Sequence, residues 1–162
     1  MRSAIPVALL ACVASTAAFA HGGHGGGHAD TVARSAAGTP FGRSGDVQQI
    51  SRTVAVNMSD SACQTPGALA LRAGETIRFL ITNSGRETHE LVIGTMSGVK
   101  EHAETVEQDA DVDHDEPYMA HVEPQATQSI VWQFTRVGTF HYGCHVPSLP
   151  GPGVIGRITV SR

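Results

Sequence analysis

The residues best suited to chemistry lie near the C-terminus, in the stretch GTFHYGCHVPSLPGPGVIGRITVSR from Gly138 to Arg162. Cys144 ends an alternating apolar run there, and a Pro- and Gly-rich loop follows it. His89 opens another apolar stretch, HELVIG, much earlier in the chain. Thiolate and imidazole together suit copper, because the soft sulfur holds Cu(I) and imidazole accepts both oxidation states. His89 and Cys144 are therefore the main candidate metal ligands.

Apolar residues alternate with polar ones in several short runs, which predicts half-buried antiparallel strands. Asn83-Ser84-Gly85 and Val137-Gly138 have turn chemistry between such runs. Short strands separated by Gly-rich turns, with at most one helix, indicate an all-β sandwich. The expected strands are residues 53–58, 69–72, 76–83, 89–94, 129–134, 139–144 and 156–160, with a helix-compatible segment at 98–108 and an acidic loop at 109–117.

The alternation also predicts which side chains face the core. His89 and Cys144 both fall in inward-facing sets, so the strands should direct them to one side of a sheet. The expected inward sets are Ile77, Phe79 and Ile81; His89, Leu91 and Ile93; Ile130, Trp132 and Phe134; and Phe140, Tyr142 and Cys144.

Taken together, these features resemble the cupredoxins, the plastocyanin- and azurin-like proteins, and most closely the small periplasmic cupredoxins linked to copper tolerance in bacteria. The resemblance extends from Thr53 to Val160. It implies a Greek-key β-sandwich with one short helix, a type-1 copper cofactor, and one-electron transfer and/or copper handling rather than enzymatic activity. The matching motifs are Thr88-His89-Glu90, His114-Asp-Glu-Pro117 with Met119, Ile130-Val-Trp-Gln-Phe134, and the Cys144 loop.

The chain departs from this family in the Cys144 loop. Where the family has its second ligand histidine and its methionine, this chain has Leu149 and Val154, although Cys144, Pro147, Gly153 and Gly156 keep the register. The alternative function is therefore copper sequestration or tolerance through a His-rich N-terminal tail, with a degenerate, redox-inactive type-1 site. Substitute ligands are His145, then His121, with Met119 as a thioether donor; in a continuous strand His145 would face away from Cys144.

The cysteines allow two interpretations. Cys12 belongs to the expected export signal, which leaves Cys63 and Cys144 in an oxidising compartment. A Cys63–Cys144 disulfide is one interpretation. We favour the other, a free Cys144 that binds copper, with Cys63 as a small buried apolar residue.

The N-terminus has the pattern of an export signal. Arg2 precedes an apolar run that ends at Ala18-Phe-Ala20, which fits the small-x-small rule for cleavage after Ala20. We therefore expect a signal peptide at 1–20, a flexible His- and Gly-rich tail at 21–48, a cupredoxin domain at 49–162, and periplasmic localisation. The tail histidines, which form a second candidate copper site or only a solvating linker, are His21, His24 and His28.

Charge and hydropathy limit the expected partners. The full chain has a net charge of −4 at pH 7, with 11 Lys+Arg against 15 Asp+Glu and no basic cluster. This balance argues against a nucleic-acid partner. The apolar run of the signal is too short to span a bilayer, and no other segment is long and apolar enough. The expected partners are the copper ion and a redox partner protein.

Overall fold

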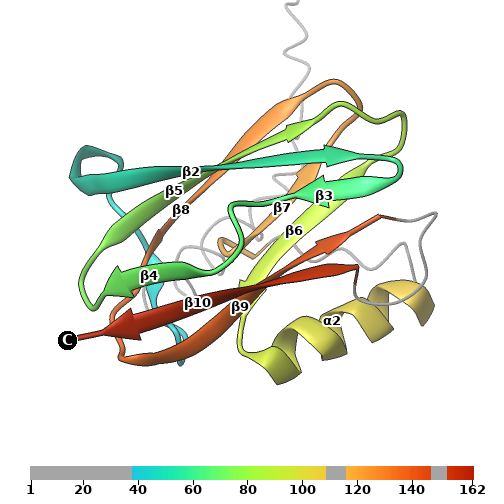
Figure 1. Cartoon of the computed structure of the whole chain (residues 1–162). Helices are drawn as coiled ribbons and strands as arrows, with labels where there is room; N and C mark the ends of the chain where they lie inside the picture. The colour runs from blue at the N-terminus through green and yellow to red at the C-terminus, as the bar shows by residue number, and fades with distance from the viewer. Residues whose placement is uncertain (1–37, 109–115, 147–152) are drawn as a thin grey trace, which may run out of the picture.

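The described residues form an antiparallel-rich β-sandwich of two five-stranded sheets with one α-helix (Figure 1). In the computed structural model, the described residues are 38–108, 116–146 and 153–162. The expected signal peptide, the tail histidines, most of the acidic loop and Leu149 lie outside them. The all-β class with one helix, predicted from the alternation of apolar residues, is confirmed.

The first sheet has the strand order β1-β8-β5-β2-β3. Its central pair, β2 and β5, runs parallel, whereas β8 and β3 pair antiparallel with their neighbours. The short strand β3 therefore lies at an open edge of this sheet. The bounds are β1 Arg43–Ser44, β2 Ile50–Ser59, β3 Ala62–Gln64, β5 Thr76–Asn83 and β8 Thr127–Gln133.

The second sheet has the order β4-β10-β9-β6-β7 and carries both main candidate ligands. Strands β6 and β9 are antiparallel neighbours inside it, so His89 and Cys144 come from adjacent strands. Helix α2 (Met96–Gln108) follows β6 directly and packs against β6 and β9. The bounds are β4 Leu69–Arg72, β6 His89–Gly94, β7 Met119–Val122, β9 Gly138–His145 and β10 Val154–Ser161.

The core lies between the two sheets and is built from the inward sets that period-2 alternation predicts. All twelve residues of the four expected sets are buried, nine of them with no exposed surface. Trp132, Tyr142 and Phe79 are the largest fully buried side chains. Because His89 and Cys144 belong to this same inner layer, both are enclosed by apolar side chains rather than by solvent.

The packed part of the chain begins earlier than the expected boundary at residue 49. Phe41 is buried in the core beside Trp132, with ring centroids 5.3 Å apart. Strand β1 pairs antiparallel with β8, and Asp46 caps the short 3₁₀ helix Val47–Gln49 by accepting from the Gln48 amide. Residues 39–48 therefore belong to the domain, because one aromatic anchor gives this Gly-rich segment enough buried surface to order it.

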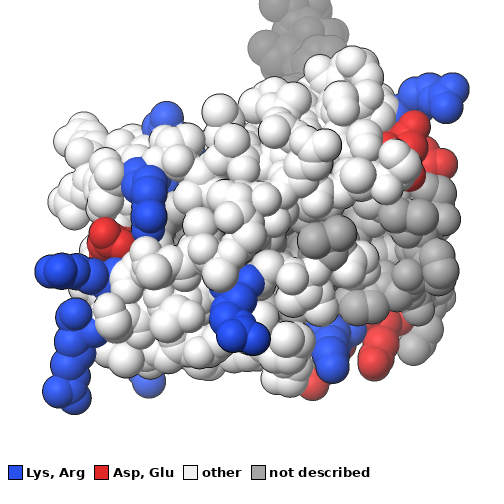
Figure 2. All heavy atoms as spheres, in the orientation of Figure 1, with Lys and Arg blue, Asp and Glu red and all other residues white. Residues whose placement is uncertain are grey.

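The helix α2 is too short and polar to cross a membrane, and no other helix among the described residues is long and apolar enough. On the face drawn in Figure 2, acidic and basic side chains lie mostly near the edges, and much of the middle is uncharged.

Candidate metal centre

His89 is the first candidate ligand, and its ring is fully enclosed. It opens β6, faces the core and has no exposed surface. Neither Nδ1 nor Nε2 makes a hydrogen bond, although Nε2 lies 3.5 Å from Asp60 Oδ1. An unpartnered ring nitrogen in an apolar interior is costly unless something else satisfies it. The arrangement resembles a metal-binding histidine, in which a carboxylate faces one ring nitrogen and the other is left for the ion.

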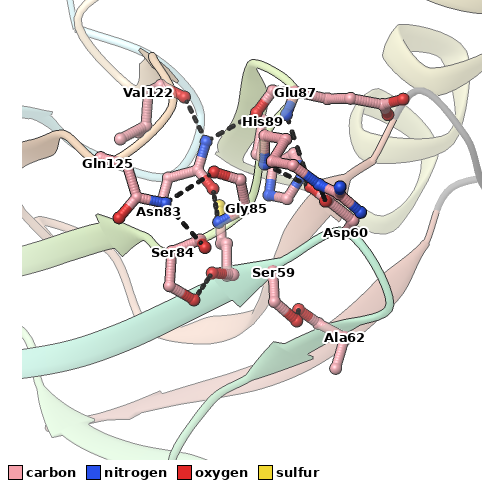
Figure 3. Close-up of polar contacts among 12 residues, drawn as sticks. Ser59, Asp60, Ala62, Asn83, Ser84, Gly85, Glu87, His89, Val122 and Gln125 are labelled. Carbon is pink, nitrogen blue, oxygen red and sulfur yellow. Dashed lines mark hydrogen bonds and ion pairs between the residues drawn. The ribbon is translucent and has the colours of Figure 1, made fainter.

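Asp60 is held in place by the chain that leads into β6. It accepts from the Arg86 amide at 2.7 Å and from the Glu87 amide at 3.4 Å (Figure 3). These contacts lower the pKa of Asp60, the Arg86 amide contributing most. Gly85 allows the close approach, because a Cβ there would lie 2.2 Å from Asp60 Oδ1. Asp60 is therefore a fixed, ionised neighbour of His89 Nε2.

Asn83 fixes the same turn from the other side. Its side-chain amide donates to the carbonyls of Glu87 and Val122, each at 2.8 Å, and its Oδ1 accepts from the Gly85 amide at 2.8 Å (Figure 3). A buried side chain that satisfies three backbone groups stabilises one loop conformation. It sets the point at which His89 enters the sheet.

Cys144, the second candidate, is joined to Cys63 by a disulfide. This corrects our preference for a free Cys144 and a Cys63 without a partner. Cys63 lies opposite Met58 on the edge strand β3, and Cys144 lies in β9 of the other sheet. The two inner faces meet there, and the Cα atoms are 6.4 Å apart, within the range that a disulfide can bridge.

The disulfide links the two sheets across a separation of 81 residues. Closing so long a loop in the unfolded chain stabilises a folded protein by about 2–4 kcal/mol in the chain-entropy account. The sequence alone could not choose this pairing, because it depends on two sheets meeting at one end of the sandwich. The bridge adds to stability, and it occupies the sulfur that a type-1 copper ion would need.

A type-1 copper ion does not fit the inner face in this disulfide state. His89 offers a buried nitrogen, but Cys144 sulfur is bonded to carbon and sulfur and is not a thiolate. Among the described residues, no three His, Cys, Asp or Glu side chains form a group arranged to hold a metal ion. Leu149, at the family's second histidine position, lies outside them.

The substitute ligands lie on the other face of the same sheet. Register pairs Glu90 with His145 on β9 and with His121 on β7, and it pairs Met119 with Val92. Directly paired residues share a face, and neighbours along a strand alternate. Strand β9 continues through His145, so its side chain faces away from Cys144. The sheet thus separates His145, His121 and Met119 from the inner pair.

Glu90 is the centre of that outer face, which helix α2 covers. Its side chain is only 5% exposed, and its Oε1 lies 2.7 Å from His102 Nε2 and 3.7 Å from His121 Nε2. His102 comes from α2, so this contact joins the helix to β6. Burying a carboxylate requires such partners. The outer group therefore has a clear structural role in seating α2.

We expect Glu90→Ala to lower the free energy of unfolding by roughly 1–3 kcal/mol, because it leaves two imidazoles without their carboxylate. Chemical denaturation of the apo-protein measures the change. Glu87→Ala is the matched control, since it removes the same charge from an exposed side chain nearby. Equal stabilities of the two variants would show that Glu90 does not hold the helix.

Sequence reasoning missed Asp60 and His102. Asp60 lies in a turn, between β2 and β3, and its role depends on backbone amides 26 and 27 residues away. His102 had a weaker signal available: an imidazole on a helix directly after a strand that carries His89-Glu90. Neither contact follows from spacing along the chain.

The fold is that of a cupredoxin. Two solved structures show the likeness: auracyanin B, with a TM-score of 0.55 and 19% identity over 77% of this chain and 97% of that one, and dithionite-reduced auracyanin from Roseiflexus castenholzii, with a TM-score of 0.51 and 18% identity over 68% and 96%. At these identities the likeness concerns the architecture. No protein-family model matches the chain.

The sequence relatives identify the family. The chain is 39% identical, over 99% of both proteins, to the copper-resistant cuproprotein CopI of Rubrivivax gelatinosus. It is 29% identical to the protein of the same name from Pseudomonas aeruginosa, over 82% of this chain and 88% of that one. The chain belongs to the CopI family of copper-resistant cuproproteins.

Proposed function

We propose that this chain binds copper as part of copper tolerance, holding the ion rather than transforming a substrate. The observation that carries the proposal is the 39% identity to a copper-resistant cuproprotein across nearly the whole of both chains. A match of that extent supports a shared role as well as a shared fold. His89 gives independent support, because its buried Nδ1 has the surroundings expected of a metal ligand.

Two regions would hold the ion. The inner pair, His89 and Cys144, offers an imidazole and, once the disulfide is reduced, a thiolate. This set suits Cu(I), which accepts low coordination and soft sulfur. The tail histidines offer nitrogen donors that Cu(II) prefers; they are His21, His24 and His28.

One-electron transfer is the second candidate function. It is favoured by the position of His89 and Cys144 on adjacent strands of a stiff inner layer, which limits reorganisation of a bound ion. The disulfide weighs against it, because a sulfur bonded to Cys63 cannot act as a copper thiolate. We therefore rank copper holding first.

An exported location accords with this role. The signal at residues 1–20, cleaved after Ala20, would deliver the protein to the periplasm, where disulfides form readily and copper arrives from outside. After cleavage the amine of His21 would become an additional copper ligand.

Copper stoichiometry and the visible spectrum of the mature protein test the proposal. We expect the oxidised protein to bind Cu(II) with only a weak visible band. An intense thiolate-to-Cu(II) band after reduction of the disulfide would favour electron transfer instead. A protein that binds no copper in either state would contradict both functions.

Deleting residues 21–28 should lower the Cu(II) stoichiometry and leave the melting temperature of the apo-protein unchanged, because we expect a His- and Gly-rich terminal segment to contribute little to the core. Deleting 29–36, an equally long segment without histidine, is the control for chain length. Inductively coupled plasma analysis and thermal denaturation provide the two readouts. A loss of several degrees on deletion of 21–28 would show that the tail is packed structure.

A further inference from the structure

The two cysteines of the disulfide lie in different environments. Cys63 is partly exposed on the short edge strand β3, whereas Cys144 has no exposed surface in β9. Thiol–disulfide exchange begins when a thiolate reaches one of the two sulfurs, and access decides which one is attacked. Of the two residues only Cys63 has exposed surface, which favours attack at Cys63 with Cys144 as the leaving sulfur.

The leaving sulfur is released beside the buried histidine. Register pairs Cys144 with Leu91, and His89 is two residues before Leu91 on the same inner face. The two candidate ligands are thus diagonal neighbours on adjacent strands. His89 Nδ1, without a hydrogen-bond partner, is the second donor in the same layer.

One hairpin touches both candidate ligands. Strands β2 and β3 are joined by a tight turn that contains Asp60, and Cys63 follows three residues later. Asp60 faces His89 Nε2, and Cys63 binds Cys144 Sγ. The hairpin therefore places a carboxylate beside the nitrogen ligand and holds the sulfur ligand in a disulfide.

We propose that Cys63 is a thiol-exchange site that gates copper binding at Cys144, with a dithiol as the reacting partner. One thiolate of the dithiol attacks Cys63 Sγ, the Cys63–Cys144 bond breaks, and its electron pair leaves with Cys144 sulfur. The second thiolate then attacks the mixed disulfide and releases Cys63. Two electrons and two protons pass from the dithiol to this protein, and the dithiol becomes a disulfide.

This proposal rests on the proposed copper-binding function and says how copper binding would be regulated. The oxidised protein has one main ligand at the inner site, and the reduced protein has two. If copper binds only the reduced form, its binding shifts the thiol–disulfide equilibrium toward that form by mass action. An oxidising compartment without copper returns the pair to the disulfide.

The decisive test compares Cys63→Ser with Cys144→Ser. Both variants lack the disulfide and lose the same loop closure, but only Cys63→Ser retains the Cys144 thiol. The probe is Cu(I), supplied without oxygen as its bicinchoninate complex, and the readout is the competitor's absorbance. We expect Cys63→Ser to bind Cu(I) about 100-fold or more tighter than Cys144→Ser, since a direct ligand outweighs the 10–100-fold effect of an outer-shell group.

The parent protein provides the second arm. Oxidised parent should match Cys144→Ser, and parent reduced with tris(2-carboxyethyl)phosphine and desalted should match Cys63→Ser. Circular dichroism checks that each form is folded. If either variant fails to fold, the comparison of oxidised with reduced parent decides the test by itself. Equal, measurable affinities in all forms would overturn the gate and leave copper binding standing. Absence of Cu(I) and Cu(II) binding throughout would overturn the proposed function.

A separate experiment measures which of the two sulfurs is attacked. Oxidised parent is exposed to a monothiol such as cysteamine, quenched in acid, and mapped by mass spectrometry. We expect the mixed disulfide on Cys63 and a free thiol on Cys144. An adduct that forms first on Cys144 would overturn the assignment of Cys63 as the exchange site.

Discussion

Gly156→Ala should destabilise the protein by about 3 kcal/mol, the upper end of what overpacking a core costs. Gly156 lies in β10 directly opposite Tyr142 in β9. A Cβ at this position would lie 1.8 Å from Tyr142 Cζ and 2.1 Å from its Oη. The fully buried tyrosine ring would have to move, and the hydrogen bond from its hydroxyl to the Gly67 carbonyl, 3.0 Å long, would be lost.

Chemical denaturation of oxidised apo-protein measures this loss. Gly94→Ala is the matched control, because Gly94 lies in β6 of the same sheet and a Cβ there would meet nothing closer than 3.7 Å. We expect that control to change stability much less. If the two variants unfold at the same denaturant concentration, the Tyr142 ring does not pack over Gly156 as described.

The glycines of the family register thus have a structural explanation that needs no copper. Gly153 adopts a φ of +61°, and a Cβ there would lie 1.8 Å from the Cys144 carbonyl oxygen. Gly156 makes room for Tyr142. Both positions preserve the β9–β10 frame whether or not a metal is bound. The presence of glycine at these two positions therefore supports the fold more strongly than it supports a working type-1 centre.

The strands of the sandwich could be predicted because their signal is local. Strands β4, β5 and β6 have the predicted bounds, since apolar residues alternate along each and turn residues flank them. Strands β1, β3 and β7 were missed, because two to four residues are too few to show a clear period. Their positions depend on the strands with which they pair, namely β8, β2 and β6.

The candidate site, too, could be predicted from the sequence only in part. The inward direction of His89 and Cys144 follows from alternation along β6 and β9. The contacts that decide their chemistry come from the β2–β3 hairpin, through Asp60 and Cys63, and these depend on how one sheet lies over the other. Alternation within a strand contains no information about the opposite sheet. The disulfide and the carboxylate therefore became evident only in three dimensions.

Restoring the family's second histidine is the prediction with the largest expected effect on copper. Leu149 lies outside the described residues, so the prediction rests on the register that Cys144, Gly153 and Gly156 maintain around it. The variant should carry Cys63→Ser as well, because the disulfide otherwise withholds Cys144. With His89 and Cys144 available, Leu149→His would supply the second imidazole and complete a trigonal donor set for Cu(II).

We expect Cys63→Ser/Leu149→His to bind Cu(II) at least about 100-fold more tightly than Cys63→Ser alone, a difference of about 3 kcal/mol. An intense visible thiolate-to-Cu(II) band should appear with it. Cys63→Ser/Val154→Met is the matched control: it restores only the long, weak axial bond, and should alter affinity far less. If Leu149→His changes neither affinity nor spectrum while Cys63→Ser already shows the full band, another residue completes the site. His145 and His121 are then the first positions to replace.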